Sequence, residues 1–276
     1  MNIRLLGTFE VTLHGVTVMP TAPKPRQLLA LLALHADQVV PVGSLTEELW
    51  AGRPPRTART TLQTYVLQLR ELIAAALEQG QREQQGETVR KTAKDVLVTL
   101  PGGYLLDSGG GTVDVRELER LTGIGYRAMD AGDFQGAARY LREGLAQWTG
   151  PAFADVHTGP QLEMEAKRLE ETRLCALNQR IEAELRLGRH RDLLAELTVL
   201  VNRYPTHESL HGQFMLALHR SGRRGEALEA YQRIRSTLVR ELGLEPSAEL
   251  RRVQQLILMA SPEPAPARRG RLVRTS

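Results

Sequence analysis

One stretch of the sequence, between Glu48 and Glu71, contains several arginines and no carboxylate. Such a gap in negative charge suits a phosphate backbone, because a carboxylate there would repel the phosphates at short range. The candidate phosphate-binding cations are Arg53, Arg56, Arg59 and Arg70. The stretch therefore predicts a surface that contacts nucleic acid.

A helix expected over residues 57–77 would divide this stretch into two faces. At 100° per residue, one face is apolar and consists of Ala58, Leu62, Tyr65, Val66, Leu69, Leu72 and Ile73. The opposite face, with Arg59 on its flank, consists of Arg56, Thr57, Thr60, Gln63, Thr64, Leu67, Gln68 and Arg70. Glutamine can pair bidentately with adenine, and a threonine methyl group can meet the methyl group of thymine. This face is therefore predicted to read bases in the major groove.

The alternative interpretation is an ordinary amphipathic helix whose polar face is merely solvated. The face is rich in threonine and glutamine instead of the glutamate and lysine that are typical of a solvated helix. The elements on either side also favour DNA binding, because they predict a helix-turn-helix followed by a hairpin.

The elements before this helix are expected to be short strands and two helices. Strand-like patterns occupy residues 3–6, 9–13 and 16–18. Pro25 suits the first turn of a buried, leucine-rich helix. Residues 39–40 are expected to be extended, and Ser44 is predicted to cap a short helix that ends near Trp50, with Glu47 completing a capping box.

A hairpin is expected after the long helix. Its strands would cover residues 96–100 and 104–106, joined by a turn at Pro101-Gly102-Gly103. The polar residues 79–94 between helix and hairpin are expected to be a flexible surface insertion. In a helix-turn-helix domain such a hairpin would be the wing.

The second half is expected to be helical, with turns marked by glycine. Gly188 and Gly222 are 34 residues apart, which is the period of a tetratricopeptide helix pair. We predict an N-terminal domain over residues 1–108, a helical repeat domain over residues 112–260, and a disordered basic tail over residues 261–276.

Two motifs resemble enzyme signatures but lack the necessary context. His207 and His211 form an HExxH pattern, yet no third zinc ligand stands out, and we expect partly exposed helix residues there. A GxGxxA pattern begins at Gly123 but follows a helix where a dinucleotide site requires a strand. No Walker A sequence is present, and Cys175 is expected to be a small core residue. No enzymatic activity, cofactor or metal is therefore predicted.

The composition places the chain among ordinary globular proteins. Its 276 residues are 42% hydrophobic, and the longest purely apolar run, residues 28–34, is far too short to cross a bilayer. The net charge is +1 over residues 1–110, zero over residues 111–260 and +3 in the tail. With one cysteine and no membrane segment, we expect a cytoplasmic protein whose DNA binding depends on local charge patterning.

Several segments together resemble a known family. The order of KPRQLLALLAL, SLTEELW, TLQTYVLQLR and VTLPGGYLL resembles an OmpR-type winged-helix domain, and in detail the Streptomyces antibiotic regulatory protein family. The second half, with its specific ELGLEPSAEL segment, resembles the bacterial transcriptional activation domain of that family. The resemblance covers residues 3–258 and fits the short members without an ATPase module. It implies a mainly α fold: an α+β winged helix-turn-helix domain followed by an all-α, tetratricopeptide-like repeat domain.

The resemblance also implies a function and partners. Such proteins activate a secondary-metabolite gene cluster, bind direct repeats near the promoter −35 element and recruit the RNA polymerase holoenzyme. Two copies would pair head to tail on the repeats. The implied major-groove contacts are Thr60, Gln63, Thr64, Leu67, Gln68 and Arg70; the sigma-factor loop contributes Trp50, Arg53, Pro54 and Arg56; the wing contributes Lys94, Gly102, Gly103 and Tyr104.

The sequence departs from the family pattern at a few positions. Many relatives carry basic residues where Leu67, Gln68 and Glu71 stand, and the wing turn has Pro101 in place of a cation. Phosphate contacts are then expected to be fewer, or to come in part from the insertion, at Arg90, Lys91 and Lys94.

A competing hypothesis is a helical-repeat interaction scaffold that does not read DNA specifically. In that case the repeats would bind a peptide and the first half would only stabilise the assembly. The arginine-, threonine- and glutamine-rich face without acids favours the DNA-binding hypothesis.

Overall fold

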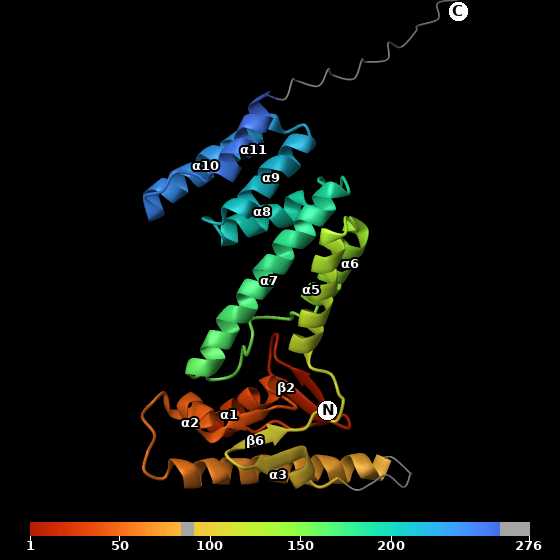
Figure 1. Cartoon of the computed structure of the whole chain (residues 1–276), viewed down its shortest axis with the longest axis vertical. Coiled ribbons are helices and arrows are strands. Elements are labelled where there is room, and N and C mark those ends of the chain that lie inside the picture. The colour runs from red at the N-terminus through yellow and green to blue at the C-terminus, as the bar shows by residue number, and fades with distance from the viewer. Residues whose placement is uncertain (84–90, 260–276) are drawn as a thin grey trace, which may run out of the picture. The chain divides into compact units, whose positions relative to one another are not determined.

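A computed structural model describes residues 1–83 and 91–259 of the chain (Figure 1). By its internal contacts the chain forms two compact units, one over Met1–Ala183 and one that begins at Glu184. Residues 108–112, where the sequence suggests a domain boundary, lie within the first unit. The expected mainly α fold with small N-terminal sheets is confirmed.

The chain begins with an antiparallel sheet of three short strands, β1 (Asn2–Arg4), β2 (Glu10–Leu13) and β3 (Val16–Thr17). Ile3 pairs with Val11, and both side chains are buried. The hairpin between β2 and β3 turns at His14 and Gly15, whose φ angles are both positive, at 52° and 81°. This conformation is typical of a tight two-residue hairpin and explains the glycine at the second position.

Three helices form the core of the N-terminal region: α1 (Pro23–Leu34), α2 (Val42–Trp50) and α3 (Ala58–Glu83). Residues 28–33 of α1 are all buried, as expected for a helix that is apolar on every side. The expected cap of α2 is wrong. Helix α2 begins at Val42 directly after Pro41, so Ser44 lies inside the helix and makes no capping hydrogen bond.

A second antiparallel sheet contains the expected hairpin and one further strand. Its order is β4 (Val39–Pro41), β6 (Gly103–Leu106) and β5 (Leu97–Leu100), and the short helix α4 (Ala93–Val96) precedes β5. Gly103 lies where β6 passes close to β4, since a Cβ atom there would come within 2.5 Å of the Val40 carbonyl oxygen. A capping box is present at a different helix, where Thr92 and Asp95 cap the start of α4.

The first unit continues with helices α5 (Asp114–Asp130), α6 (Phe134–Leu145) and most of α7 (Pro160–Arg186). Helix α5 runs without interruption through the GxGxxA pattern, which therefore has no strand before it. Asp114 joins α5 to the first sheet region, because its carboxylate accepts hydrogen bonds from the amides of Leu5 (2.6 Å) and Leu6 (2.8 Å). Burial raises the pKa of Asp114.

The second unit contains helices α8 (Leu194–Arg203), α9 (Glu208–Arg220), α10 (Arg224–Leu242) and α11 (Ala248–Met259). The turns at Gly188 and Gly222 both use positive φ angles, near 80°, that favour glycine. Helix–turn–helix units thus recur at the spacing that the sequence indicates. None of the helices in the described part of the chain is long and apolar enough to cross a membrane.

Candidate nucleic-acid interface

Helix α3 divides into the two faces that the sequence predicts, and it packs against α1 and β5 (Figure 1). Leu62, Val66, Leu69 and Ile73 are buried in the core of the N-terminal region. The polar face is open to solvent over Arg59, Thr60, Gln63, Thr64, Leu67 and Gln68. Uncharged hydrogen-bonding groups therefore cover most of the exposed surface of the helix over residues 59–68, with a cation at its start.

Arg70 occupies a different position from the other members of this face. It is half-buried, and its guanidinium donates to the Leu97 carbonyl from Nε (3.1 Å) and Nη2 (2.7 Å). Nη2 also donates to the hydroxyl of Thr99 at 2.8 Å. Arg70 thus attaches α3 to strand β5 of the wing hairpin. The sequence alone predicted a base contact at this position.

Three arginines before and at the start of α3 are exposed. Arg53, Arg56 and Arg59 have no carboxylate partner among the residues that the structure describes. The loop that carries the first two turns sharply after α2, where Ala51 and Gly52 both have positive φ angles. These cations are therefore available to an anionic partner.

The loop that was expected to contact a sigma factor is not uniformly exposed. Arg53, Pro54 and Arg56 face solvent, whereas Trp50 is half-buried and packs against the hydrophobic core. Truncation of Trp50 would therefore disturb packing as well as any external contact.

The wing residues also divide into exposed and buried groups. Lys94 and Gly102 are exposed, and Gly102 turns the hairpin with a φ angle of 84°. Tyr104 and Gly103, however, are buried; Tyr104 is only 8% exposed and belongs to the core cluster. The prediction that these two residues present a wing surface is wrong, because β6 is the central strand of its sheet and Tyr104 points into the core.

The insertion supplies fewer free cations than the sequence suggested. Lys91 forms an ion pair with Asp107 at 2.8 Å, and its hydrogen bond lowers the pKa of that carboxyl. Arg90 and the basic tail over residues 261–276 lie outside the described residues. Among the described residues of this region, Lys94 is the exposed cation without a carboxylate partner.

A buried carboxylate that the sequence analysis missed fixes the start of α7 against α2. Glu48 is only 1% exposed and accepts hydrogen bonds from the amides of Gly159 (2.6 Å), Gln161 (2.9 Å) and Leu162 (3.1 Å). The side-chain amide of Gln27 donates to the same carboxylate at 2.9 Å. A carboxylate at a helix N-terminus is favourable, because it satisfies amides that lack partners within the helix. The sequence could have indicated that Glu48 is buried, because its position three residues after Leu45 places it on the core face of α2.

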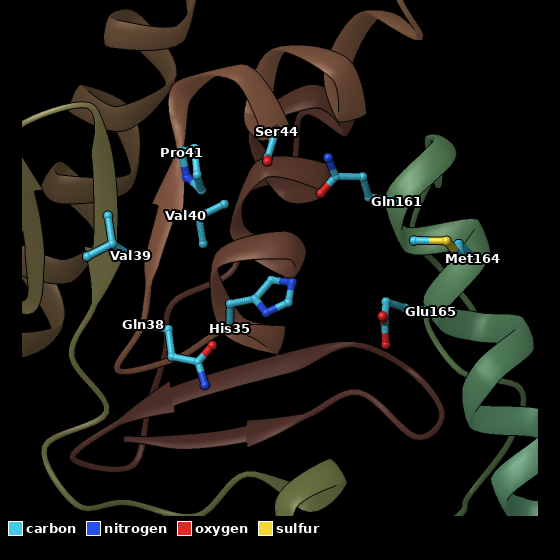
Figure 2. Close-up of a pocket in the computed structure, with 9 residues that line it drawn as sticks. All are labelled: His35, Gln38, Val39, Val40, Pro41, Ser44, Gln161, Met164 and Glu165. Atoms are coloured by element: carbon cyan, nitrogen blue, oxygen red, sulfur yellow. The ribbon is translucent and has the colours of Figure 1, made fainter.

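A cavity of about 310 Å³ lies beside this junction, between the end of α1 and strand β4 on one side and α7 on the other (Figure 2). Its polar lining includes His35, Gln161 and Glu165, and burial lowers the pKa of His35. None of its lining residues belongs to α3. The cavity is therefore separate from the exposed face of that helix.

The HExxH histidines do not form a metal site. His207 caps α9 by accepting a hydrogen bond at Nδ1 from the Leu210 amide (3.3 Å). His211 is 7% exposed, so the expectation of partly exposed residues is wrong for it, and burial lowers its pKa to about 4. Among the described residues no group of three or more histidine, cysteine or acidic side chains could hold a metal ion. Cys175 is exposed on α7, not buried as expected, because that side of α7 faces solvent.

Comparison with protein families divides the chain into two matched regions. The family described as the bacterial transcriptional activator domain matches residues 113–258. The family described as the C-terminal part of transcriptional regulatory proteins matches residues 17–92, a range that includes all of α1, α2 and α3.

Similar proteins are transcriptional regulators by name. The regulatory protein DnrI of Streptomyces peucetius is 50% identical over 262 residues, which cover 95% of this chain and 93% of DnrI. The transcriptional regulatory protein EmbR of Mycobacterium bovis is 33% identical over 95% of this chain and 64% of EmbR. A solved structure of Mycobacterium tuberculosis EmbR with a low-affinity phosphopeptide aligns with a TM-score of 0.82 and 32% identity, over 93% of this chain and 64% of EmbR.

Proposed function

We propose that this chain is a sequence-specific activator of an antibiotic biosynthetic gene cluster. The chain belongs to the Streptomyces antibiotic regulatory protein family. Members of this family regulate transcription through an OmpR-type DNA-binding domain and are not enzymes. The observation that carries the proposal is the exposed face of α3 over residues 59–68, which contains no acidic side chain and has free arginines at and before its start.

In this proposal α3 lies in the major groove and the arginines contact the flanking phosphates. Gln63 and Gln68 present amide groups that can donate and accept at base edges. Arg53, Arg56 and Arg59 add sequence-independent affinity that falls as salt rises. Arg70 positions the wing hairpin beside α3, because its guanidinium donates to the Leu97 carbonyl of the hairpin.

The experiment that tests base reading is a gel shift with the variant Gln68→Ala on a duplex selected from a random library by the full chain. Loss of a bidentate base contact is expected to cost about 1–3 kcal/mol and to relax specificity at one base pair. Gln232→Ala is the matched control, because Gln232 is exposed on α10. Unchanged affinity and unchanged specificity in Gln68→Ala would contradict the assignment of this face.

Promoter activation adds two finer parts to the proposal: binding to direct repeats near the −35 element by two head-to-tail copies, and recruitment of RNA polymerase holoenzyme. Footprinting on the promoters of the adjacent biosynthetic genes tests the first part. Two protected repeats on one face of the DNA are expected, and a single protected half-site would contradict it.

The loop over Arg53, Pro54 and Arg56 is proposed to contact the sigma factor. Alanine variants of these residues are compared in gel shifts and in run-off transcription with purified holoenzyme. A residue that contacts polymerase retains DNA binding and loses transcript. If every loop variant loses the two activities in proportion, the loop contacts DNA alone. A chain that selects no DNA sequence would support the scaffold hypothesis instead.

A further inference from the structure

The exposed face of α3 contains two side chains that offer methyl groups and no free hydrogen-bond donor. Leu67 is 57% exposed in the middle of the polar face. Thr64, three residues earlier and therefore on the same side of the helix, is also exposed. Its hydroxyl donates a hydrogen bond to the Thr60 carbonyl of the same helix at 3.1 Å.

This hydrogen bond determines what Thr64 can offer to a ligand. A threonine hydroxyl that donates to the carbonyl four residues earlier has its one proton in use. The side chain can then offer a ligand its methyl group and a hydrogen-bond acceptor, but no donor. Thr64 and Leu67 therefore form a small apolar pair on an otherwise hydrogen-bonding surface.

The surroundings of the pair limit what it can contact. A single exposed leucine is ordinary on a protein surface, and these two residues are too small to form a protein-docking patch. Their neighbours on the face, Gln63 and Gln68, are uncharged donors and acceptors, and Glu71 lies one turn beyond Leu67. In the major groove the apolar group at a base edge is the C5-methyl group of thymine.

We infer that Thr64 and Leu67 read thymine by contact with its C5-methyl group, while the neighbouring glutamines read hydrogen-bonding edges. The inference rests on the proposed function, since it requires α3 to lie in the major groove. It names the base feature that this surface selects, which the proposed function leaves open.

The test replaces single thymines by deoxyuridine in a duplex that the full chain has selected from a random library. Deoxyuridine keeps the pairing with adenine and removes only the methyl group. Each methyl group that the pair contacts is expected to account for about a fourfold change in affinity. At the position that Leu67 contacts, the effect of deoxyuridine should disappear in Leu67→Ala. Val199→Ala, a truncation at an exposed position of α8, is the matched control and should retain the full effect.

Two substitutions at Thr64 separate its methyl group from its hydroxyl. Thr64→Val retains the methyl groups and should bind with the same dependence on thymine methyl groups. Thr64→Ser retains the hydroxyl and should lose about fourfold at the thymine that Thr64 contacts.

Two results would overturn the inference while leaving the proposed function intact. In one, the chain binds its selected duplex tightly and no deoxyuridine position changes the affinity. In the other, Thr64→Ser binds like the unmodified chain and Thr64→Val does not, which would assign the contact to the hydroxyl. A chain that selects no sequence at all would overturn the proposed function together with this inference.

Discussion

The surroundings of α3 and helix α9 of the repeats leave polar groups without partners in opposite places. Around α3 the unpaired groups are on the surface, where Arg53, Arg56 and Arg59 have no carboxylate nearby in the described part of the chain. In the repeats an unpaired group is buried: neither ring nitrogen of His211 makes a hydrogen bond of normal geometry. Several surface arginines of the other helices contact carboxylates, as at Arg116, Arg120, Arg168, Arg223 and Arg235.

The difference shows which arginines can bind an external anion. An arginine that already contacts a carboxylate has its charge neutralised locally, so a phosphate gains little from approaching it. An exposed arginine without such a partner retains its full attraction for phosphate. The location of unpaired cations is therefore more informative than the net charge, which is +4 for the whole chain.

The largest expected effect comes from removing the free cations together. In the triple variant Arg53→Ala, Arg56→Ala, Arg59→Ala, DNA affinity should fall by about 4 kcal/mol, or roughly 1,000-fold, if each arginine forms one charge-assisted phosphate contact. The dependence of the binding constant on salt should decrease in slope by roughly 3. Fluorescence anisotropy with a labelled duplex over a range of salt concentrations measures both quantities.

The control for this variant removes equal charge from paired positions: Arg120→Ala, Arg223→Ala and Arg235→Ala. It should change DNA affinity only slightly. Equal losses in the two triple variants would mean that net charge, not the surface around α3, determines binding, and the comparison between the regions would fail.

The second prediction concerns the buried histidine of the repeats. Burial lowers the pKa of His211 to about 4. The unfolded chain, whose histidine has a pKa near 6.5, therefore binds more protons between these values, and stability must fall as pH decreases from about 6.5 to 4. The expected loss is about 2–3 kcal/mol after allowance for partial solvent screening.

Chemical denaturation at a series of pH values measures this loss as the difference between the unmodified chain and His211→Leu, because carboxylates titrate equally in both. The variant should show a flatter profile across this interval. His157→Gln, at an exposed histidine, should retain the profile of the unmodified chain. Identical profiles for His211→Leu and the unmodified chain would mean that the ring is accessible to protons in the folded state.

The smallest effect is expected for the stability of the paired-arginine control. Arg120, Arg223 and Arg235 form ion pairs that are exposed to solvent, and such pairs contribute little to folding. Thermal unfolding monitored by circular dichroism should give the same midpoint for this variant and the unmodified chain. A clearly lower midpoint would show that these pairs hold the repeats together.

Local periodicity was sufficient to predict most elements and the two faces of α3, because the alternation of apolar and polar residues is a property of neighbours in sequence. It missed the end of α3 and helix α4, which overlap the segment that was expected to be a flexible insertion. Contacts between distant residues could not be predicted in this way. The helical pattern assigns Arg70 to the polar face, but Arg70 contacts Leu97 of β5, which is 27 residues later in the chain. The hairpin pattern predicts that Tyr104 is a wing residue, but β4 pairs with the other side of β6, and Tyr104 is buried.

The same limit explains the errors at single polar residues. Ser44 and Glu47 have the spacing of a capping box, but Pro41 ends β4 so close to them that the helix begins earlier. The HExxH spacing correctly places two histidines at the start of a helix, yet whether His211 is exposed depends on how neighbouring helices cover it. Glu48 could be placed on the core side of α2, whereas its partners at the start of α7 are more than a hundred residues away.

The carboxylates of Glu48 and Asp114 bear on how this protein can be divided. A fragment ending at residue 108 would retain all the residues that form the exposed face of α3. In that fragment, however, the Leu5 and Leu6 amides would lose their acceptor, Asp114. Glu48 would keep its charge but lose the three amides that donate hydrogen bonds to it. A fragment that keeps these contacts therefore has to extend through the first part of α7. A chain trimmed to its sequence-defined winged helix would lack these contacts and is expected to be less stable than one that includes them.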